Sequence, residues 1–439
     1  MEDRVTNSTD SSFADHRASH DSRLTTHDSL ATGQRSLGDP RIEYPLWPPL
    51  TAGCPRTSTA TVAYPLEIAY DYGSAPDDLF ATPPASDLAR WAPLLPPLLP
   101  GGGLGEGATP LLVAPRLADW AGFDGELYIK DESRNPTWSH KDRLNRAAVS
   151  AAALSGAPGI VVASSGNHGA AAAAYAARAG LPCVVVASAG APPAVVSFLA
   201  AYGAAVVAVP SEARWPILRA IVEEFGFQPV SNRTVTHTGH PFGPEGYKTI
   251  AYELFLQLGR RVPAAVFVPT GYAELLYGLW KGFRELGTLG LTEAAPAIVA
   301  CEPAARAPLA RALAAGLPAT EVPATPTDAY GVAVTVSGYR GIVALRESDG
   351  WPELVDDAAA REAQRALAHE GVWQELSGAV GLAGLRAAIR AGRTFAGPVV
   401  CIGTSSGFKD RGVGEGAFPA LAPEWPAVRD YLRREYGLG

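Results

Sequence analysis

One lysine of this chain stands in a setting that suggests covalent chemistry. Lys141 is one of only five lysines in 439 residues and lies in NPTWSHKDR (135–143), upstream of SSGNHG (164–169). A primary amine can form an imine with an aldehyde, which is how a lysine holds pyridoxal phosphate. We therefore interpret Lys141 as a Schiff-base lysine. The alternative is an ordinary solvated lysine at the start of a helix.

The SSGNHG segment is predicted to bind an anion. GIVVAS (159–164) is typical of a strand and an Ala-rich helix follows, so the loop lies at the carboxyl edge of a parallel sheet. Free backbone N–H groups and the positive helix end attract anions there. Asn167 can donate to a ring oxygen of the cofactor. A substrate carboxylate would meet Ser164, Ser165, Gly166 and His168. Taken alone, such a loop is often only a helix cap.

Two further turns follow strands and could complete a cofactor site. In VPTGYAELLYG (268–278), a phosphate would be held by the backbone N–H groups of Gly271, Tyr272, Ala273 and Glu274. Because a carboxylate aimed at a phosphate is repulsive, we expect the Glu274 side chain to point outward and cap the helix. In CIGTSSGFKD (401–410), the Thr404 hydroxyl could bond a pyridine nitrogen.

Short apolar runs alternate with segments of helical length, which indicates βαβ units and a parallel α/β sheet. We expect strands at 126–130, 159–164, 183–188, 204–210, 264–271, 297–303 and 399–404. We expect helices at 142–155, 169–180, 193–202, from the 271 turn through 287, and at the carboxyl end. A Pro/Gly-rich connection occupies 92–107. Two α/β units are therefore predicted to flank a cleft.

The composition favours a small-molecule partner. Forty-four acidic against 36 basic residues give a net charge of −8, without a basic block, so no nucleic acid partner is expected. Four separated cysteines without a CxxC pair argue against a structural zinc and against disulfides, and favour a cytoplasmic location. No apolar run is long enough to cross a membrane. His237 and His240 are interpreted as parts of a polar loop, and no metal site is expected.

Residues 1–40 are predicted to form a disordered tail, because they are polar and poor in large apolar side chains. His16, His20 and His27 are not interpreted as a metal cluster in this setting. The segment has no apolar core of a secretion signal, and its aspartates are atypical of a transit peptide.

Five motifs together resemble fold-type-II pyridoxal-phosphate enzymes, and most closely the threonine synthase family. In the order of that family they are EGATPL (106–111), KDESRNPTWSHKDR (130–143), SSGNHG, EGYKT (245–249) and TSSGFKD (404–410). The resemblance implies a fold like that of the tryptophan synthase β subunit, with two three-layer αβα domains and a cofactor cleft between them. The larger domain would comprise 41–145 and 245–439, and the smaller one 146–244.

The resemblance also implies a function. The chain would act on an amino acid by β/γ-elimination or replacement through an external aldimine, as a homodimer. Lys141 would carry pyridoxal 5'-phosphate and then act as the general base on Cα. By the same resemblance Asn167 meets the ring oxygen, residues 271–274 hold the phosphate and Thr404 faces the ring nitrogen. His140 resembles the histidine that precedes this lysine in the tryptophan synthase β subunit, near the phosphate.

Departures from the family pattern leave alternatives open. Trp138 and His140 stand where the family usually has glycine and phenylalanine, and His168 is more like serine and threonine dehydratases. The phosphate turn lacks the usual glycine or asparagine after Gly271. The alternatives are a dehydratase, a β-replacement enzyme similar to cysteine or tryptophan synthase, a non-catalytic cofactor-binding regulator, and a nucleotide-binding α/β protein. We also expect Glu375 and Ser377 to line the pocket of the cofactor ring. Arg143 is expected either to pair with a carboxylate or to brace Asp131 or Asp142.

Overall fold

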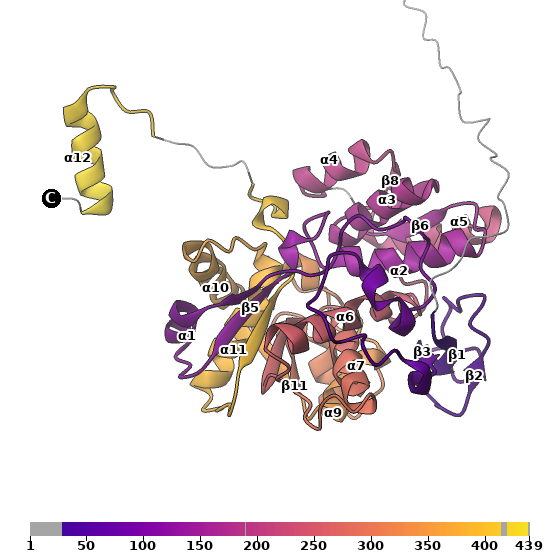
Figure 1. Ribbon diagram of the computed structural model, residues 1–439. Helices are drawn as coiled ribbons and strands as arrows, with labels where there is room; N and C mark the ends of the chain where they lie inside the picture. The colour runs from indigo at the N-terminus through magenta and orange to yellow at the C-terminus, as the bar shows by residue number, and fades with distance from the viewer. Residues whose placement is uncertain (1–28, 189, 414–418, 438–439) are drawn as a thin grey trace, which may run out of the picture.

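The fold contains three sheets, two of them covered by helices (Figure 1). The computed structural model describes residues 29–188, 190–413 and 419–437. The histidines at 16, 20 and 27 lie outside the described residues. The helices are α1 Pro115–Ala121, α2 Lys141–Leu154, α3 Asn167–Ala179, α4 Pro193–Ala201, α5 Arg214–Phe225, α6 Gly243–Gln257, α7 Glu274–Thr288, α8 Pro308–Ala314, α9 Tyr339–Glu347, α10 Asp357–His369, α11 Leu376–Arg390 and α12 Trp425–Tyr436.

The largest sheet has six strands in the order β12-β11-β10-β13-β5-β4, with every pair parallel except β4–β5. Its strands are β4 Leu111–Val113, β5 Leu127–Asp131, β10 Ala265–Pro269, β11 Ala297–Pro303, β12 Pro352–Val355 and β13 Val399–Gly403. Successive side chains of a strand point to opposite faces. Accordingly Val266 and Val268 of β10 join the core under α6 and α7, whereas Phe267 joins the core with α1, α10 and α11. Apolar burial on both faces explains why the central strands β10, β11 and β13 are nearly continuous hydrophobic runs, whereas the edge strands β4 and β12 are partly exposed.

The second sheet is smaller and fully parallel, in the order β8-β7-β6-β9. Its strands are β6 Ile160–Ala163, β7 Cys183–Ala187, β8 Ala205–Ala208 and β9 Gln228–Pro229. Val162 and Val185 pack with the buried alanines of α3, and Val161 and Val186 pack with Leu218 of α5. Alanine on α3 lets that helix approach the sheet closely, and its first residues thereby reach the cleft.

The predicted disorder of residues 1–40 is wrong for 29–40. Here β1 Ala31–Ser36 is the central strand of a three-stranded antiparallel sheet, between β2 Glu43–Tyr44 and β3 Leu66–Tyr70. Gln34 is fully buried, and its side-chain amide donates to the carbonyls of Pro45, Leu46 and Pro48. The composition of residues 1–40 did not predict this strand. The strand is ordered because it pairs with β3, at least 30 residues further along the chain, and because the side chain of Gln34 is buried and hydrogen-bonded.

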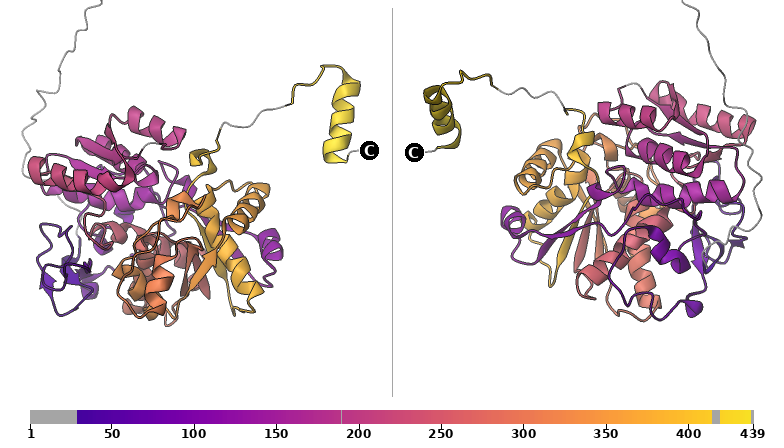
Figure 2. Two further views of the ribbon diagram at one scale, coloured as in Figure 1. Left: turned by 180° about the vertical axis from the view of Figure 1, so that it is seen from behind. Right: turned by 45° about the horizontal axis from the view of Figure 1, so that its top comes forward.

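Helix α12 lies apart from the rest of the chain in all views (Figures 1 and 2). None of its residues is buried, and Trp425 and Tyr436 are exposed by 64% and 70%. Within the described ranges, no helix is both long enough and apolar enough to cross a membrane.

Candidate functional site

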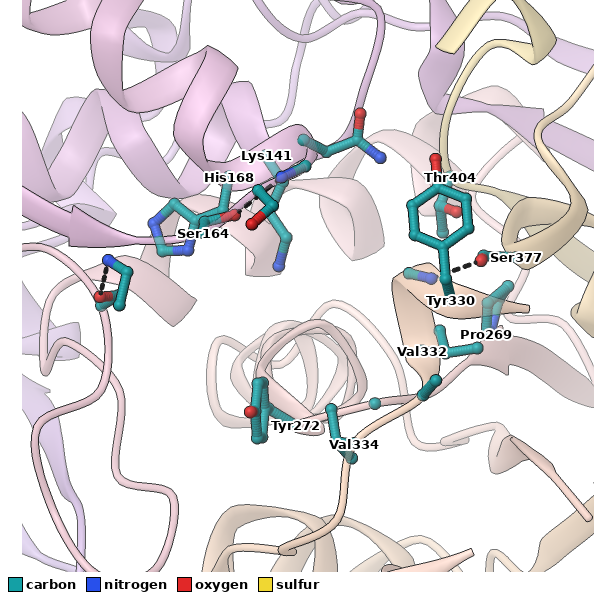
Figure 3. Close-up of a pocket in the computed structure, with 18 of the residues that line it drawn as sticks. Lys141, Ser164, His168, Pro269, Tyr272, Tyr330, Val332, Val334, Ser377 and Thr404 are labelled. Atoms are coloured by element: carbon teal, nitrogen blue, oxygen red, sulfur yellow. Dashed lines mark hydrogen bonds between the residues drawn. The ribbon is translucent and has the colours of Figure 1, made fainter. Parts of the chain in front are cut away.

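A cavity of about 700 Å³ lies where the smaller sheet meets the six-stranded sheet. Turns that follow β6, β10 and β13 open into it together with the first residues of α2, α3 and α7, as Figure 3 shows for Lys141, Tyr272 and Thr404. The cavity brings together all predicted site residues, namely His140, Lys141, Ser164, Ser165, Gly166, Asn167, His168, Gly271, Tyr272, Ala273, Glu274 and Thr404. It also includes Glu375 and Ser377.

Lys141 is the first residue of α2 and extends into this cavity (Figure 3). Its Nζ lies 5.5 Å from the centroid of the Tyr247 ring and forms no hydrogen bond with any described residue. Removal from water lowers the pKa of the amine, while the nearby carboxylates of Glu274 and Glu375 oppose that shift. A lowered pKa increases the share of neutral amine, which is the form that attacks an aldehyde.

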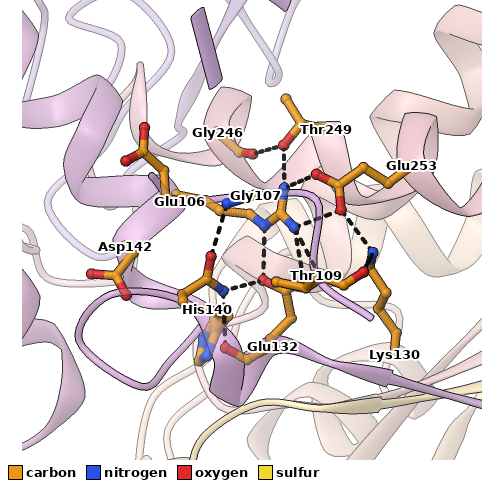
Figure 4. A network of polar contacts seen from close by, with 12 residues as sticks. Glu106, Gly107, Thr109, Lys130, Glu132, His140, Asp142, Gly246, Thr249 and Glu253 are labelled. Carbon is orange, nitrogen blue, oxygen red and sulfur yellow. Dashed lines mark hydrogen bonds and ion pairs between the residues drawn. The ribbon is translucent and has the colours of Figure 1, made fainter. Parts of the chain in front are cut away.

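A buried ion network fixes the start of α2 (Figure 4). The guanidinium of Arg143 donates to both oxygens of Glu132, at 2.8 Å each, and to both oxygens of Glu253, at 2.6 and 2.8 Å. Thr109 and Thr249 accept further bonds from it. Asp131 and Asp142 are not its partners. Because both carboxylates come from other elements, the network locks α2 to α6 and to the end of β5, and so orients Lys141.

The SSGNHG loop forms the amino-terminal end of α3. The helix begins at Asn167 after Gly166, and no side chain caps it, so its first N–H groups remain available to an anion. Asn167 Nδ2 donates to Glu375 at 2.9 Å, and Ser405 Oγ donates to the Asn167 oxygen at 3.2 Å. Burial raises the pKa of Glu375 to about 7, even though Lys409 and Asn167 stabilise its carboxylate.

His140 joins α2 to the end of β13. Its backbone N–H donates to the carbonyl of Thr404 at 3.0 Å, and its Nδ1 lies 3.1 Å from the same oxygen. Burial keeps the pKa of His140 well below its usual range, with Lys141 adding to the effect. Burial likewise lowers the pKa of His168 to about 3. Both imidazoles are therefore neutral and can act as hydrogen-bonding groups without charge.

The turn after β10 differs from the expectation for Glu274. Its side chain is buried, with 6% of the residue exposed, and packs against Gly239 instead of pointing outward. The reason is that α7 begins inside the molecule, where Ala273 adopts a left-handed conformation (φ 62°) and the loop at 237–240 covers the helix start. His237 also belongs to the cavity wall, where its ring stacks on Tyr272 at 4.0 Å.

The backbone conformation of Trp138 explains how this residue can stand where the threonine synthase family usually has glycine. Its φ of 62° lies in the left-handed region that favours glycine, so the loop keeps the conformation although the residue type has changed. The indole packs edge-on against Phe198 of α4, with ring centroids 5.2 Å apart, and against Phe408 at 5.7 Å. This contact links the lysine loop to the smaller sheet's helices.

Sequence reasoning missed several residues of the cavity wall: Arg214, Arg306, Asp328, Tyr330 and Arg411. Tyr330 donates to the carbonyl of Lys409 at 3.0 Å and lies 3.5 Å from Glu375. Only Arg411 had a sequence signal, since it directly follows the TSSGFKD motif. The others come from segments without a recognisable motif, which tertiary folding brings to the site.

Comparisons with known proteins agree with this geometry. The family model described as "Pyridoxal-phosphate dependent enzyme" matches residues 103–405. A threonine synthase of Methanosarcina acetivorans is 33% identical over 79% of this chain and 86% of its own length. A threonine synthase of Synechocystis is 34% identical over 75% of this chain and 87% of its own length.

Solved structures share the fold. A maize serine racemase superimposes with a TM-score of 0.59 at 22% identity, covering 75% of this chain and 93% of that one. A T.th. threonine deaminase superimposes with a TM-score of 0.56 at 28% identity, covering 68% of this chain and 92% of that one.

Proposed function

This chain belongs to the family of pyridoxal-phosphate-dependent enzymes, and we propose that it breaks a bond at the β or γ carbon of an amino acid, like its threonine synthase relatives. When bound, pyridoxal phosphate draws electrons from Cα of an amino acid and so stabilises negative charge there. The observation that carries the proposal is that Lys141 shares one cavity with the amino-terminal ends of α3 and α7.

The residues present fit such a cofactor. The amine of Lys141 is without a hydrogen-bond partner among the described residues, and the cavity of about 700 Å³ lies in the range of small-molecule and cofactor sites. The start of α7 and the turn before it offer the backbone N–H groups of residues 271–274 to a phosphate. One group in this turn does not fit a phosphate: the buried carboxyl group of Glu274, which would repel it when ionised.

We assign two roles to Lys141. Its lowered pKa makes the amine available to hold the cofactor covalently, and the same amine, once released, removes the proton from Cα of the substrate. Tyr247 lies beside the Nζ and limits the directions in which the amine can swing. His140 and the Arg143 network keep the lysine at one position through both steps.

The other predicted residues bind and orient. Asn167 would meet the ring oxygen and Thr404 the ring nitrogen, and His140 would help residues 271–274 to hold the phosphate. Ser164, Ser165, Gly166 and His168 would bind the substrate carboxylate at the start of α3. Neutral His168 can hydrogen-bond a carboxylate without adding charge to the cavity.

A dehydratase-like reaction on serine or threonine is the second candidate. It is favoured by the 28% identity to the T.th. threonine deaminase and by His168 after the asparagine. Both candidates share removal of the Cα proton by Lys141 and differ in which bond breaks next.

Replacing Lys141 with alanine tests the proposal. Lys141→Ala is expected to abolish the visible absorbance of the bound cofactor and to reduce turnover by at least about 10³-fold, because no other described residue of the cavity wall carries a primary amine. Lys141→Arg is the matched control: it keeps the positive charge but cannot form the imine, and we expect the same loss. Normal turnover in either variant, with an unchanged circular dichroism spectrum, would contradict the assignment.

The reaction class is tested on the intact protein with O-phosphohomoserine, serine and threonine. Threonine and inorganic phosphate from the first would support the threonine synthase-like reaction. Ammonia and a 2-oxo acid from the others would support the dehydratase. A cofactor spectrum that responds to none of a wider panel of amino acids would favour a non-catalytic regulator.

We further propose a homodimer in the cytoplasm, with a larger domain of residues 41–145 and 245–439 and a smaller one of 146–244. The two helix-covered sheets support the division into domains. Sedimentation of the purified protein tests the dimer, and a monomer at micromolar concentration would contradict it.

A further inference from the structure

Glu274 is a buried acid at the place where an anion is needed. It is the first residue of α7, and its own backbone N–H belongs to the turn assigned to the cofactor phosphate. Its carboxyl group lies inside the molecule, with one oxygen packed against Gly239 and the other 3.9 Å from Nε2 of His237. Every position from Gly271 to Glu274 lines the same cavity as Lys141.

The surroundings of Glu274 do not neutralise it. Burial keeps His237 neutral, because its pKa falls well below the usual range, so the contact with His237 is not an ion pair. The backbone of His240 supplies a hydrogen bond, and Lys141 and Arg340 act on the carboxylate only over a distance. The titratable or charged groups that face it from neighbouring elements are Lys141 of α2, His237 and His240 of the preceding loop, Tyr247 of α6, Tyr272 of its own turn, and Arg340 of α9.

A phosphate held by this turn would lie close to that carboxyl group. An oxygen bonded to the N–H of Glu274 can be at most about 8 Å from the carboxyl group of the same residue, given the length of the side chain and of a hydrogen bond. At an effective dielectric constant of about 20, two like charges at that distance weaken binding roughly tenfold to a hundredfold. Removing the charge from the carboxyl group removes this repulsion.

We propose that Glu274 must be protonated for the turn at 271–274 to hold the cofactor phosphate, so that cofactor binding takes up a proton at this residue. The inference rests on the proposed function, because it requires the phosphate at this turn. Burial supports it, since it already raises the pKa of Glu274 before any anion is present. The sign follows: a bound phosphate favours the neutral acid further, so affinity falls as pH rises and Glu274 ionises.

The test compares cofactor binding by full-length apo-protein and by Glu274→Gln, a neutral side chain of the same size. Pyridoxal phosphate is titrated into each protein between pH 6.5 and 9, and the visible absorbance of the bound cofactor gives the Kd. The carboxylate of Glu274 also raises the pKa of Lys141, so Glu274→Gln changes the ionisation of that amine as well. Counting the protons taken up separates the two effects, because a more neutral amine would make the variant, and not the wild type, take up more protons. We expect the ratio of the two Kd values to change by at least about tenfold, with the variant binding more tightly at high pH.

Two controls and a second measurement make the test specific. Glu274→Asp keeps a carboxylate and should retain the wild-type pH dependence, as should Glu347→Gln, which alters an exposed acid of α9. Calorimetry in buffers of different ionisation enthalpy counts protons directly. At the pH where uptake is largest, wild-type protein should take up about 0.5–0.8 proton more than Glu274→Gln, as a tenfold to hundredfold repulsion implies.

The outcomes separate this inference from the proposed function. If the visible absorbance of bound cofactor forms in neither protein at any pH, the proposed function fails. If it forms in both and the Kd curves run parallel, with equal proton uptake, the cofactor site stands and the role of Glu274 is overturned. Should Glu274→Gln fold poorly, Glu274→Ala, which also lacks the carboxyl group, replaces it in both measurements with the same expected difference from wild type.

Discussion

Four of the five lysines of this chain are buried, and Lys141, which lines the cavity, differs from them in having no partner among the described residues. Lys130, Lys248 and Lys281 form ion pairs with Glu253, Glu285 and Glu245 at 2.6–2.9 Å, and Lys409 donates to the carbonyl of Thr137. Buried ammonium groups persist where a carboxylate or carbonyl compensates them. An amine that lacks such compensation is free to react, and this distinguishes Lys141 more sharply than its rarity.

Glu375 gives a residue-scale prediction about stability and pH. Its pKa is about 7 in the folded protein and near 4.5 when unfolded, so between these values the folded state binds more protons. The free energy of unfolding contributed by this group is therefore present at pH 4.5 and is lost as the pH rises through 7. Glu375→Gln cannot ionise at this position. We therefore expect the free energy of unfolding of its apo-protein, relative to that of the wild type, to increase by about 1–3 kcal/mol from pH 5 to pH 8.

Urea unfolding at the two pH values measures this difference. Glu223→Gln, which changes an exposed acid of α5, should leave the pH dependence unchanged. An equal response of Glu375→Gln and wild type would mean that Glu375 ionises as it does in water.

At the scale of elements, the lysine is positioned by the close approach of α2 and α6. A Cβ on Gly246 of α6 would lie 2.0 Å from the backbone oxygen of Arg143, so only glycine permits this contact. The same residue precedes the YKT part of EGYKT, and Glu245 beside it pairs with Lys248 and Lys281. The motif thus packs α6 against α2 through Gly246 and ties α6 to α7 through Glu245.

Gly246→Ala is expected to destabilise the protein and weaken cofactor binding together. The added methyl group must push α2 away from α6, which costs about 1–3 kcal/mol or more and shifts Lys141 with its helix. Thermal unfolding of the apo-protein and titration with pyridoxal phosphate measure the two effects.

Gly287→Ala is the matched control. The nearest atom to its Cβ is the Thr292 oxygen at 3.7 Å, so alanine fits on the exposed side of α7 and should stabilise the helix by up to about 1 kcal/mol. If Gly246→Ala behaved like this control, the close contact would not be what positions Lys141.

At the scale of the whole molecule, the site depends on two sheets and not on the carboxyl-terminal helix. Side chains from the first residues of α2, α3 and α7 converge only when both sheets are in place. By contrast, α12 buries none of its residues and lies apart from both sheets (Figure 2).

A chain that ends at Val413 is therefore expected to keep its fold and its cofactor site. Removing exposed residues changes the free energy of unfolding by about 0.5 kcal/mol or less, so the unfolding temperature should move by less than about 2 °C. Calorimetry and cofactor titration of the shortened chain check this. A larger loss of stability, or a change in the native mass by light scattering, would mean that α12 contacts the protein or a second subunit.

The sequence by itself determined the cofactor class and the alternation of strands and helices along the chain. Lys141 and its motifs identified the cofactor class, because covalent chemistry needs particular residue types at particular spacings. The apolar runs predicted β5, β6, β7, β8, β10, β11 and β13 to within about two residues. Burial on both faces imposes this hydrophobicity on β6, β10, β11 and β13, whereas every residue of β8 is exposed.

Only the tertiary structure decided that β1 is an ordered strand and which partners Arg143 has. It also decided that Glu274 points inward and that Tyr330 belongs to the cavity wall. Each of these depends on contacts between segments far apart in the chain. A buried side chain takes its direction and its charge from neighbours that local sequence does not name.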